Sequence, residues 1–164
     1  MLKQIIWVAS FSVLFFTGCE TPAANNHSSI QNQTNMNTSQ EKAAINALLF
    51  AYRDALNASD VGAILALYAD DGVFMPTGAP TSIGQEQVKG AYEFVFSNIQ
   101  LTIEFQIDEV ELAGDYAFAR TTSQGSTLIH ATGANVAEEN RELFVLRKIQ
   151  GEWKIARYMF NKMQ

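Results

Sequence analysis

The chain has 164 residues, of which 48% are hydrophobic, and its 11 phenylalanines are enough for one domain with a substantial core. The formal net charge is −6 and no basic run occurs, which argues against the electropositive face that a nucleic-acid-binding protein needs. We therefore expect no nucleic-acid partner.

The N-terminal segment has the pattern of a signal peptide. Lys3 precedes an apolar run over residues 5–16, which is too short to span a bilayer comfortably. The run ends in Phe16-Thr17-Gly18-Cys19, and small residues before a cysteine resemble the cleavage site of bacterial lipoproteins. The resemblance implies that residues 1–18 are removed and that Cys19 is lipidated. Ordinary secretion and a retained N-terminal anchor are the alternatives.

Residues 19–38 form a predicted flexible tether between this lipid and the domain, because they are rich in Asn, Thr and Ser and have little to bury. With Cys19 acylated, the domain has no thiol, which excludes disulfides and thiol catalysis. By the same resemblance, Glu20 after the cysteine implies the outer membrane. We therefore expect a lipid-anchored protein on the periplasmic side of a bacterial cell envelope.

Three helices are predicted at the start of the domain. The capping box Thr38-Ser39-Gln40-Glu41 and the apolar spacing behind it predict a helix over about residues 39–58. Asp60 is a suitable N-cap for a second, short helix that ends at Asp70-Asp71-Gly72. A third apolar stripe at helical spacing covers about residues 85–97.

The remaining segments have the two-residue period of strands. The predicted strands cover residues 73–75, 99–112, 116–129, 140–149 and 152–162, with a loop over 132–138 and a tight turn at Gln150-Gly151. Helices segregated from antiparallel strands predict an α+β domain over residues 39–164. We expect a cone in which three N-terminal helices pack on a curved, mainly antiparallel sheet that encloses a pocket.

Short patterns along the domain carry a family resemblance. They are Tyr52 with Ala55-Leu56-Asn57 and Asp60, then Leu67-Tyr68-Ala69-Asp70-Asp71, Gly84, and Gly151-Glu152-Trp153-Lys154-Ile155. In this order they resemble the nuclear transport factor 2-like superfamily, and within it the SnoaL-like, SgcJ/EcaC-type domains. The resemblance implies the cone-shaped fold and a homodimer. It says little about function, because one fold hosts many chemistries.

The segment from Tyr52 to Gly78 is also similar to the bacterial ketosteroid isomerases of this superfamily. Those enzymes hold an enolate with a tyrosine of the first helix and use a carboxylate after the first strand as base. The tyrosine matches Tyr52, whereas the position of the base falls at or near Met75, whose side chain cannot accept a proton. We therefore do not expect ketosteroid isomerisation by that mechanism.

Tyr52, Glu142 and Arg157 are the candidate catalytic residues. Arg157 interrupts the apolar face of the last strand, and a two-residue turn places Asn140, Glu142 and Phe144 on the same face of the facing strand. Glu142 then lies diagonal to Arg157, where the two side chains can pair, whereas a three-residue loop would put the two on opposite faces. A core tyrosine and an ion pair at the sheet rim are the structural alternatives. The predicted pocket is lined by Tyr52, Tyr68, Phe74, Phe96, Trp153, Arg157, Met159 and Asn161.

Other polar residues carry weaker signals. Asp70 and Asp71 are typical of a turn, and His130 at a strand end is typical of a solvated histidine. The sequence does not decide which face of the sheet Arg120 occupies. No His, Cys and Asp cluster has metal-ligand spacing and no cofactor motif is visible, so we expect neither a metal nor a cofactor.

The predicted function is binding of a small, largely apolar molecule, with or without proton-transfer chemistry such as isomerisation, dehydration or cyclisation. The alternative is a non-catalytic, dimeric binding or assembly module. The predicted dimer surface is the opposite face of the last hairpin, where charge rims apolar groups. It comprises Arg141, Leu143, Val145, Arg147, Lys154, Ala156, Tyr158 and Phe160.

Overall fold

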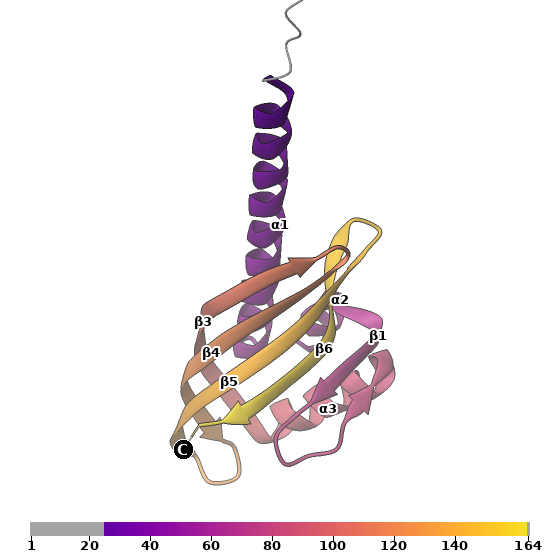
Figure 1. Ribbon diagram of the computed structural model, residues 1–164. Coiled ribbons are helices and arrows are strands. Elements are labelled where there is room, and N and C mark those ends of the chain that lie inside the picture. Colours follow the sequence, from indigo (N-terminus) through magenta and orange to yellow (C-terminus); the bar gives the residue numbers. More distant parts are fainter. Residues whose placement is uncertain (1–24, 164) are drawn as a thin grey trace, which may run out of the picture.

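Three helices pack on one curved, six-stranded sheet in the computed structural model of the protein, which describes residues 25–163 (Figure 1). In chain order the elements are α1 (Asn25–Asn57), α2 (Val61–Leu67), β1 (Tyr68–Met75), β2 (Ser82–Ile83), α3 (Gly84–Asn98), β3 (Ile99–Ala113), β4 (Tyr116–Ile129), β5 (Ala134–Ile149) and β6 (Glu152–Lys162). The strand order is β2-β1-β6-β5-β4-β3, and every pair is antiparallel except β1 with β6. The predicted α+β class and curved sheet are confirmed.

Helix α1 begins at Asn25, well before the predicted start at about residue 39. The predicted tether is therefore wrong from residue 25 onward, where the chain is helical and passes straight through the expected capping box. Residues 25–57 contain neither proline nor glycine, so nothing in their backbone stops the helix. Its N-terminal part extends beyond the sheet as a stalk (Figure 1).

The predicted signal segment and Cys19 lie outside the described residues. Within residues 25–163, no helix combines the length and the apolar character that crossing a membrane would require.

Two strands are longer than predicted. β1 begins at Tyr68, so Asp70-Asp71-Gly72 lies inside a strand rather than at the end of a helix. The predicted N-cap of α2 is confirmed, since Asp60 accepts a hydrogen bond from the backbone N–H of Ala63 at 2.9 Å. The predicted loop over 132–138 is also wrong from Ala134 on, because β5 pairs with β4 from Ala134 to Arg147. The backbone pairing, rather than apolar alternation, makes this polar segment a strand.

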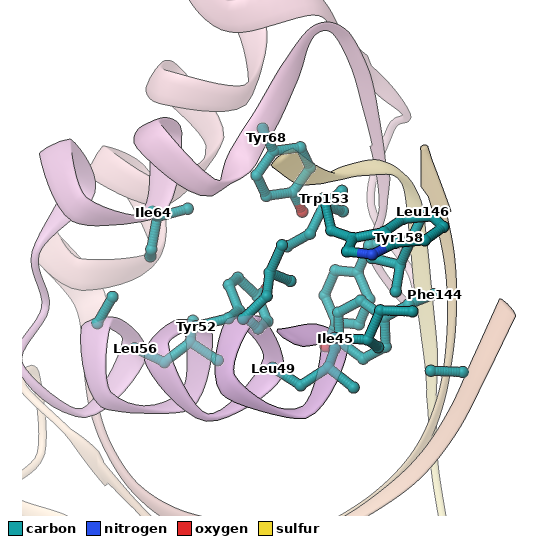
Figure 2. Close-up of a cluster of buried hydrophobic side chains, with 14 of the residues drawn as sticks. Ile45, Leu49, Tyr52, Leu56, Ile64, Tyr68, Phe144, Leu146, Trp153 and Tyr158 are labelled. Atoms are coloured by element: carbon teal, nitrogen blue, oxygen red, sulfur yellow. The ribbon is translucent and has the colours of Figure 1, made fainter. Parts of the chain in front are cut away.

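The sheet is curved, and its concave inner face packs on the helices (Figure 1). Gly125 of β4 lies close against β3, where a Cβ atom would come within 2.1 Å of the carbonyl oxygen of Thr102. Only glycine permits this approach of the two strands. Side chains of α1 such as Ile45, Leu49 and Tyr52 point at that face (Figure 2).

The β5–β6 hairpin contains the feature that decides which side chains face inward. Its turn has two residues as predicted, and Gln150 and Gly151 have φ angles of 51° and 87°. Farther along, the pairing shifts by one residue, because Leu146 lies opposite Ile155 whereas Val145 lies opposite Arg157. Such a β-bulge exchanges the two faces of every residue beyond it.

Candidate functional site

A cavity of about 140 Å³ lies between the inner face of the sheet and helices α1 and α3. Most of its wall is apolar, and its charged and amide groups come from one side, the first part of β5 and the last residue of β6. The lining residues are Tyr52, Leu56, Phe74, Pro76, Tyr92, Val95, Ile99, Leu101, Ile103, Glu138, Asn140, Glu142, Tyr158, Phe160 and Lys162.

Three tyrosine hydroxyls meet at the helical side of this cavity. The hydroxyl of Tyr92 is hydrogen-bonded to that of Tyr52 and lies 3.1 Å from that of Tyr68. Burial raises the pKa of all three hydroxyls well above their ordinary value, so they stay neutral at physiological pH. Tyr52 also packs edge-on against Phe144 and Tyr158, whose rings lie 5.6 Å and 5.3 Å away (Figure 2).

The polar side of the cavity comes from alternate residues of β5. Glu138, Asn140 and Glu142 share its inner face, and all three are buried. The Thr121 hydroxyl on β4 donates to Glu142. Glu138 accepts hydrogen bonds from the Thr127 hydroxyl at 2.8 Å and from the Lys162 ammonium at 3.2 Å.

The two carboxyl groups differ in their tendency to hold a proton. Burial raises the pKa of Glu142 above its ordinary value, and hydrogen bonds from Ser123 and Thr121 only partly offset this. Burial also acts on Glu138, but its hydrogen bonds and Lys162 outweigh that effect, so the pKa of Glu138 is lowered. Glu142 is therefore the carboxyl suited to proton exchange, and Glu138 is a fixed anion.

Five of the eight predicted lining residues lie on the inner side of the sheet, and two of them, Tyr52 and Phe74, line the cavity itself. Tyr68 and Phe96 pack behind the wall, against Tyr92. Trp153 lies in the core, where its indole N–H donates to Glu41 of α1 at 2.7 Å.

The prediction that Arg157, Met159 and Asn161 line the pocket is wrong. All three follow the bulge and lie on the outer face of the sheet, where Met159 and Asn161 are exposed. The Arg157 guanidinium donates to the backbone carbonyls of Asp71, at 3.3 Å, and Ala156, at 2.6 Å. The expected pair between Arg157 and Glu142 therefore does not form.

The same shift overturns part of the predicted dimer surface. Tyr158 and Phe160 line the cavity, and Ala156 is buried at the bulge. Leu143 does lie on the outer face, with 40% of its surface exposed.

Sequence reasoning missed several cavity residues. Asn140 was recognised on the same face as Glu142, but the assumed loop hid Glu138, two residues earlier. Tyr92 belongs to the apolar stripe predicted over residues 85–97, and nothing in that stripe indicates that its hydroxyl joins two others. Lys162 had no signal, because its place beside the cavity, where it stays exposed, depends on the bulge.

The remaining candidates have structural roles. Asp71 accepts a hydrogen bond from Arg147 at 2.5 Å, which lowers the pKa of its carboxyl. Arg120 faces outward and pairs with Asp108 at 3.0 Å, and the exposed His130 donates from Nδ1 to the Ser97 carbonyl at 3.1 Å. Among the described side chains, no group of three or more His, Cys, Asp or Glu residues is placed to hold a metal ion.

Comparisons with known proteins agree with this architecture. A family model described as a SnoaL-like domain matches residues 45–160. A ketosteroid isomerase-like protein from Erwinia carotovora atroseptica is 36% identical with a TM-score of 0.72, and the alignment covers 74% of this chain and 95% of that one. No curated protein matches the chain.

Two further solved structures share the fold at low identity. A proposed dehydratase of the NTF2-like family from Streptomyces avermitilis is 16% identical with a TM-score of 0.66, over 76% of this chain and 97% of that one. An NTF2-like protein with a cystatin-like fold from Novosphingobium aromaticivorans is also 16% identical with a TM-score of 0.66, over 80% and 88%.

Proposed function

The chain belongs to the SnoaL-like domain family, and on that premise we propose that its cavity binds a small, largely apolar molecule with which Glu142 exchanges a proton. The observation that carries the proposal is the position of Glu142, which is only 4% exposed and lies in the wall of a mostly apolar cavity. A volume of about 140 Å³ is below that of a drug-sized site and close to that of a cavity that admits benzene. The ligand is therefore about the size of a single six-membered ring.

The proton transfer has a simple form when the ligand carries a carbonyl group. The ionised Glu142 carboxylate takes a proton from the carbon next to the carbonyl. The electron pair of that C–H bond forms a carbon–carbon double bond, and the π pair of the carbonyl moves to its oxygen. Tyr52, backed by the Tyr92 hydroxyl, lines the same cavity and can donate a hydrogen bond to the resulting enolate. In a ligand with a second double bond conjugated to the enolate, return of the proton to the far carbon of that double bond would isomerise the ligand. A raised pKa suits Glu142 to this role, because it makes the carboxylate a stronger base.

The test uses cyclohexanone as a probe with the full-length chain in heavy water. We expect the wild type to speed the replacement of protons next to the carbonyl by deuterium, as followed by proton NMR. Glu142→Gln should lose the acceleration, whereas Arg141→Gln, the neighbouring residue on the outer face, should keep it. Equal rates for the wild type and Glu142→Gln would overturn the role of Glu142. Binding without any acceleration would favour the non-catalytic alternative.

We also propose that Cys19 is lipidated and holds the domain at the periplasmic side of the outer membrane. The support is the sequence pattern around the cysteine. Mass spectrometry of the protein purified from its host should find a diacyl or triacyl group on an N-terminal Cys19. An unmodified chain that still carries residues 1–18 would contradict this proposal.

A homodimer through the outer face of the sheet is the second candidate arrangement, and it is the one the non-catalytic module requires. Three large apolar side chains support it, since Phe118, Leu143 and Met159 are exposed by 40%, 40% and 37% on that face. Analytical ultracentrifugation should find a dimer that Leu143→Asp dissociates. A monomeric wild type at micromolar concentration would exclude it.

A further inference from the structure

We infer that Thr121 and Ser123 of β4 are positioning residues for the proposed proton exchange, because their buried hydroxyls hold the Glu142 carboxyl in one orientation and favour its ionised form. This inference rests on the proposed function and specifies what makes Glu142 a base. Both side chains are 0% exposed. Neither is among the residues that line the cavity, so they act through Glu142 rather than on a ligand.

The pairing of β4 with β5 brings both hydroxyls to the same carboxyl. Thr121 lies directly opposite Glu142, and Ser123 lies two residues farther along the same buried face, opposite Asn140. Side chains that are opposite or diagonal on one face of an antiparallel pair are close enough to interact. The Thr121 hydroxyl donates to Glu142 Oε2, and the Ser123 hydroxyl donates to the same carboxyl. Two donors therefore fix this carboxyl from the side of β4.

The direction of the Ser123 hydrogen bond is set by the amide of Asn140. Its Nδ2 group donates to the Ser123 oxygen at 3.3 Å and to Glu138 Oε1 at 3.1 Å. The Lys162 ammonium lies 3.2 Å from the other oxygen of Glu138 and keeps this carboxyl ionised, so Glu138 only accepts and the nitrogen must face it. Because the Ser123 oxygen already accepts a hydrogen bond from the amide, its own proton is directed to Glu142.

The two hydroxyls favour the ionised form of Glu142. An ionised carboxylate accepts both O–H groups, whereas a protonated carboxyl brings a further O–H group that needs an acceptor of its own. Burial raises the pKa of Glu142, and the hydrogen bonds from Ser123 and Thr121 act in the opposite direction. Burial therefore strengthens the base, and the hydroxyls keep more of it ionised and able to act.

The other titratable groups around Glu142 do not replace these donors. They are Asp108 of β3, Tyr52 of α1, Tyr158 of β6, and the pair that Glu138 of β5 forms with Lys162 of β6. The negative charge of Asp108 raises the pKa of Glu142. The two tyrosines stay neutral, because burial raises the pKa of their hydroxyls well above the ordinary value. Stabilisation of the Glu142 anion therefore comes from β4.

Variants that remove one hydroxyl test this role in the full-length chain. Thr121→Val keeps the shape of the side chain, and Ser123→Ala removes only the hydroxyl. We expect the midpoint of the Glu142 carboxyl titration, followed by carbon-13 NMR, to move to higher pH in both variants. The pH profile of deuterium exchange into cyclohexanone should move the same way. Its acid side should be roughly three- to tenfold slower, and the rate should recover above the new midpoint.

Two further variants separate the hydroxyl from the fold. Thr121→Ser keeps the hydroxyl and loses a methyl group, so its titration and its pH profile should match those of the wild type. Thr122→Val is the matched control, because the Thr122 hydroxyl on the outer face donates to Asp108 at 2.9 Å, and Asp108 keeps its ion pair with Arg120. This control should leave the Glu142 midpoint in place.

The outcomes distinguish this inference from the proposed function. Unchanged midpoints and pH profiles in Thr121→Val and Ser123→Ala would overturn the inference, and the proposed function would stand if Glu142→Gln still loses the exchange. A wild type that does not speed the exchange would overturn the proposed function and the inference with it. Circular dichroism shows whether each variant folds, and if one of the two does not, the other decides.

Discussion

The two faces of the β5–β6 hairpin carry similar side chains in opposite settings. On the outer face, Arg147 pairs with Asp71 and Met159 is exposed, so charge and apolar surface both meet solvent. On the inner face, Glu142 is buried beside Phe144, whose ring stacks on Tyr158 at 4.4 Å. The pKa of the outer Asp71 carboxyl is lowered by its hydrogen bond with Arg147, whereas burial in the apolar wall raises the pKa of Glu142. This difference is our reason for placing the proposed proton exchange on the inner face.

The largest difference in the free energy of unfolding is expected between neighbouring residues that lie on opposite faces. Phe144→Ala removes a ring that is 0% exposed, and it should lower the free energy of unfolding by about 3–5 kcal/mol. Leu143→Ala, one residue earlier and 40% exposed, should cost less than about 1 kcal/mol in the monomer. Urea unfolding measures both, and similar values for the two variants would contradict the assignment of faces.

The tyrosine hydroxyl cluster should give the next largest effect. Tyr92→Phe leaves the buried hydroxyls of Tyr52 and Tyr68 without their shared partner, so we expect a loss of about 1–3 kcal/mol in the free energy of unfolding. Tyr116→Phe is the control, because Tyr116 is 49% exposed on the outer face and its loss should stay below about 0.5 kcal/mol. Thermal unfolding of the two variants makes the comparison, and a neutral Tyr92→Phe would argue against the cluster.

The sequence predicted the two strands of this hairpin and the turn that joins them, but it did not predict the β-bulge. Alternation and the Gln150-Gly151 turn correctly placed Asn140, Glu142 and Phe144 on one face. The bulge at Ala156 has no sequence mark, because any residue can occupy the extra position, and it moved Arg157 from the predicted pocket to the outer face.

The other errors have different physical causes. The polar segment before residue 39 resembles a tether by composition, yet it forms part of α1. The three helices, the long β3–β4 pairing and the α+β arrangement were predictable, because they depend on hydrophobic periods sustained over many residues. The meeting of Tyr92 with Tyr52 and Tyr68 depends on how the elements pack, which a linear pattern does not contain.

The two inner glutamates should give smaller, pH-dependent effects of opposite sign. Because the folded-state pKa of Glu142 is raised, the stability that it contributes is present below the ordinary value of 4.5 and is lost as the pH rises above it. Glu142→Gln should therefore become more stable relative to the wild type as the pH rises above 4.5.

The pKa of Glu138 is lowered, so its contribution is present above 4.5 and is lost as the pH falls through the folded-state pKa. Glu138→Gln should be the less stable protein at neutral pH and should approach the wild type in acid. Urea unfolding from pH 3 to pH 8 tests both, and slopes of the same sign for the two variants would contradict the assignment.

The smallest effect is expected at an ion pair of the outer face. Arg120 pairs with Asp108 at 3.0 Å, but its own side chain is 53% exposed. Arg120→Ala should change the free energy of unfolding by less than about 1 kcal/mol, and the change should shrink further in high salt. A larger cost that is insensitive to salt would show that the outer face is buried, as in a tight dimer.

The most direct test of the cavity as a proton-exchange site is the carboxyl titration of Glu142 in the full-length chain, followed by carbon-13 NMR with and without cyclohexanone. We expect a midpoint above the ordinary glutamate value, and a further rise when the probe fills the cavity, while the midpoint of the outward Asp71 carboxyl does not move. An ordinary midpoint that the probe leaves unchanged would contradict the account.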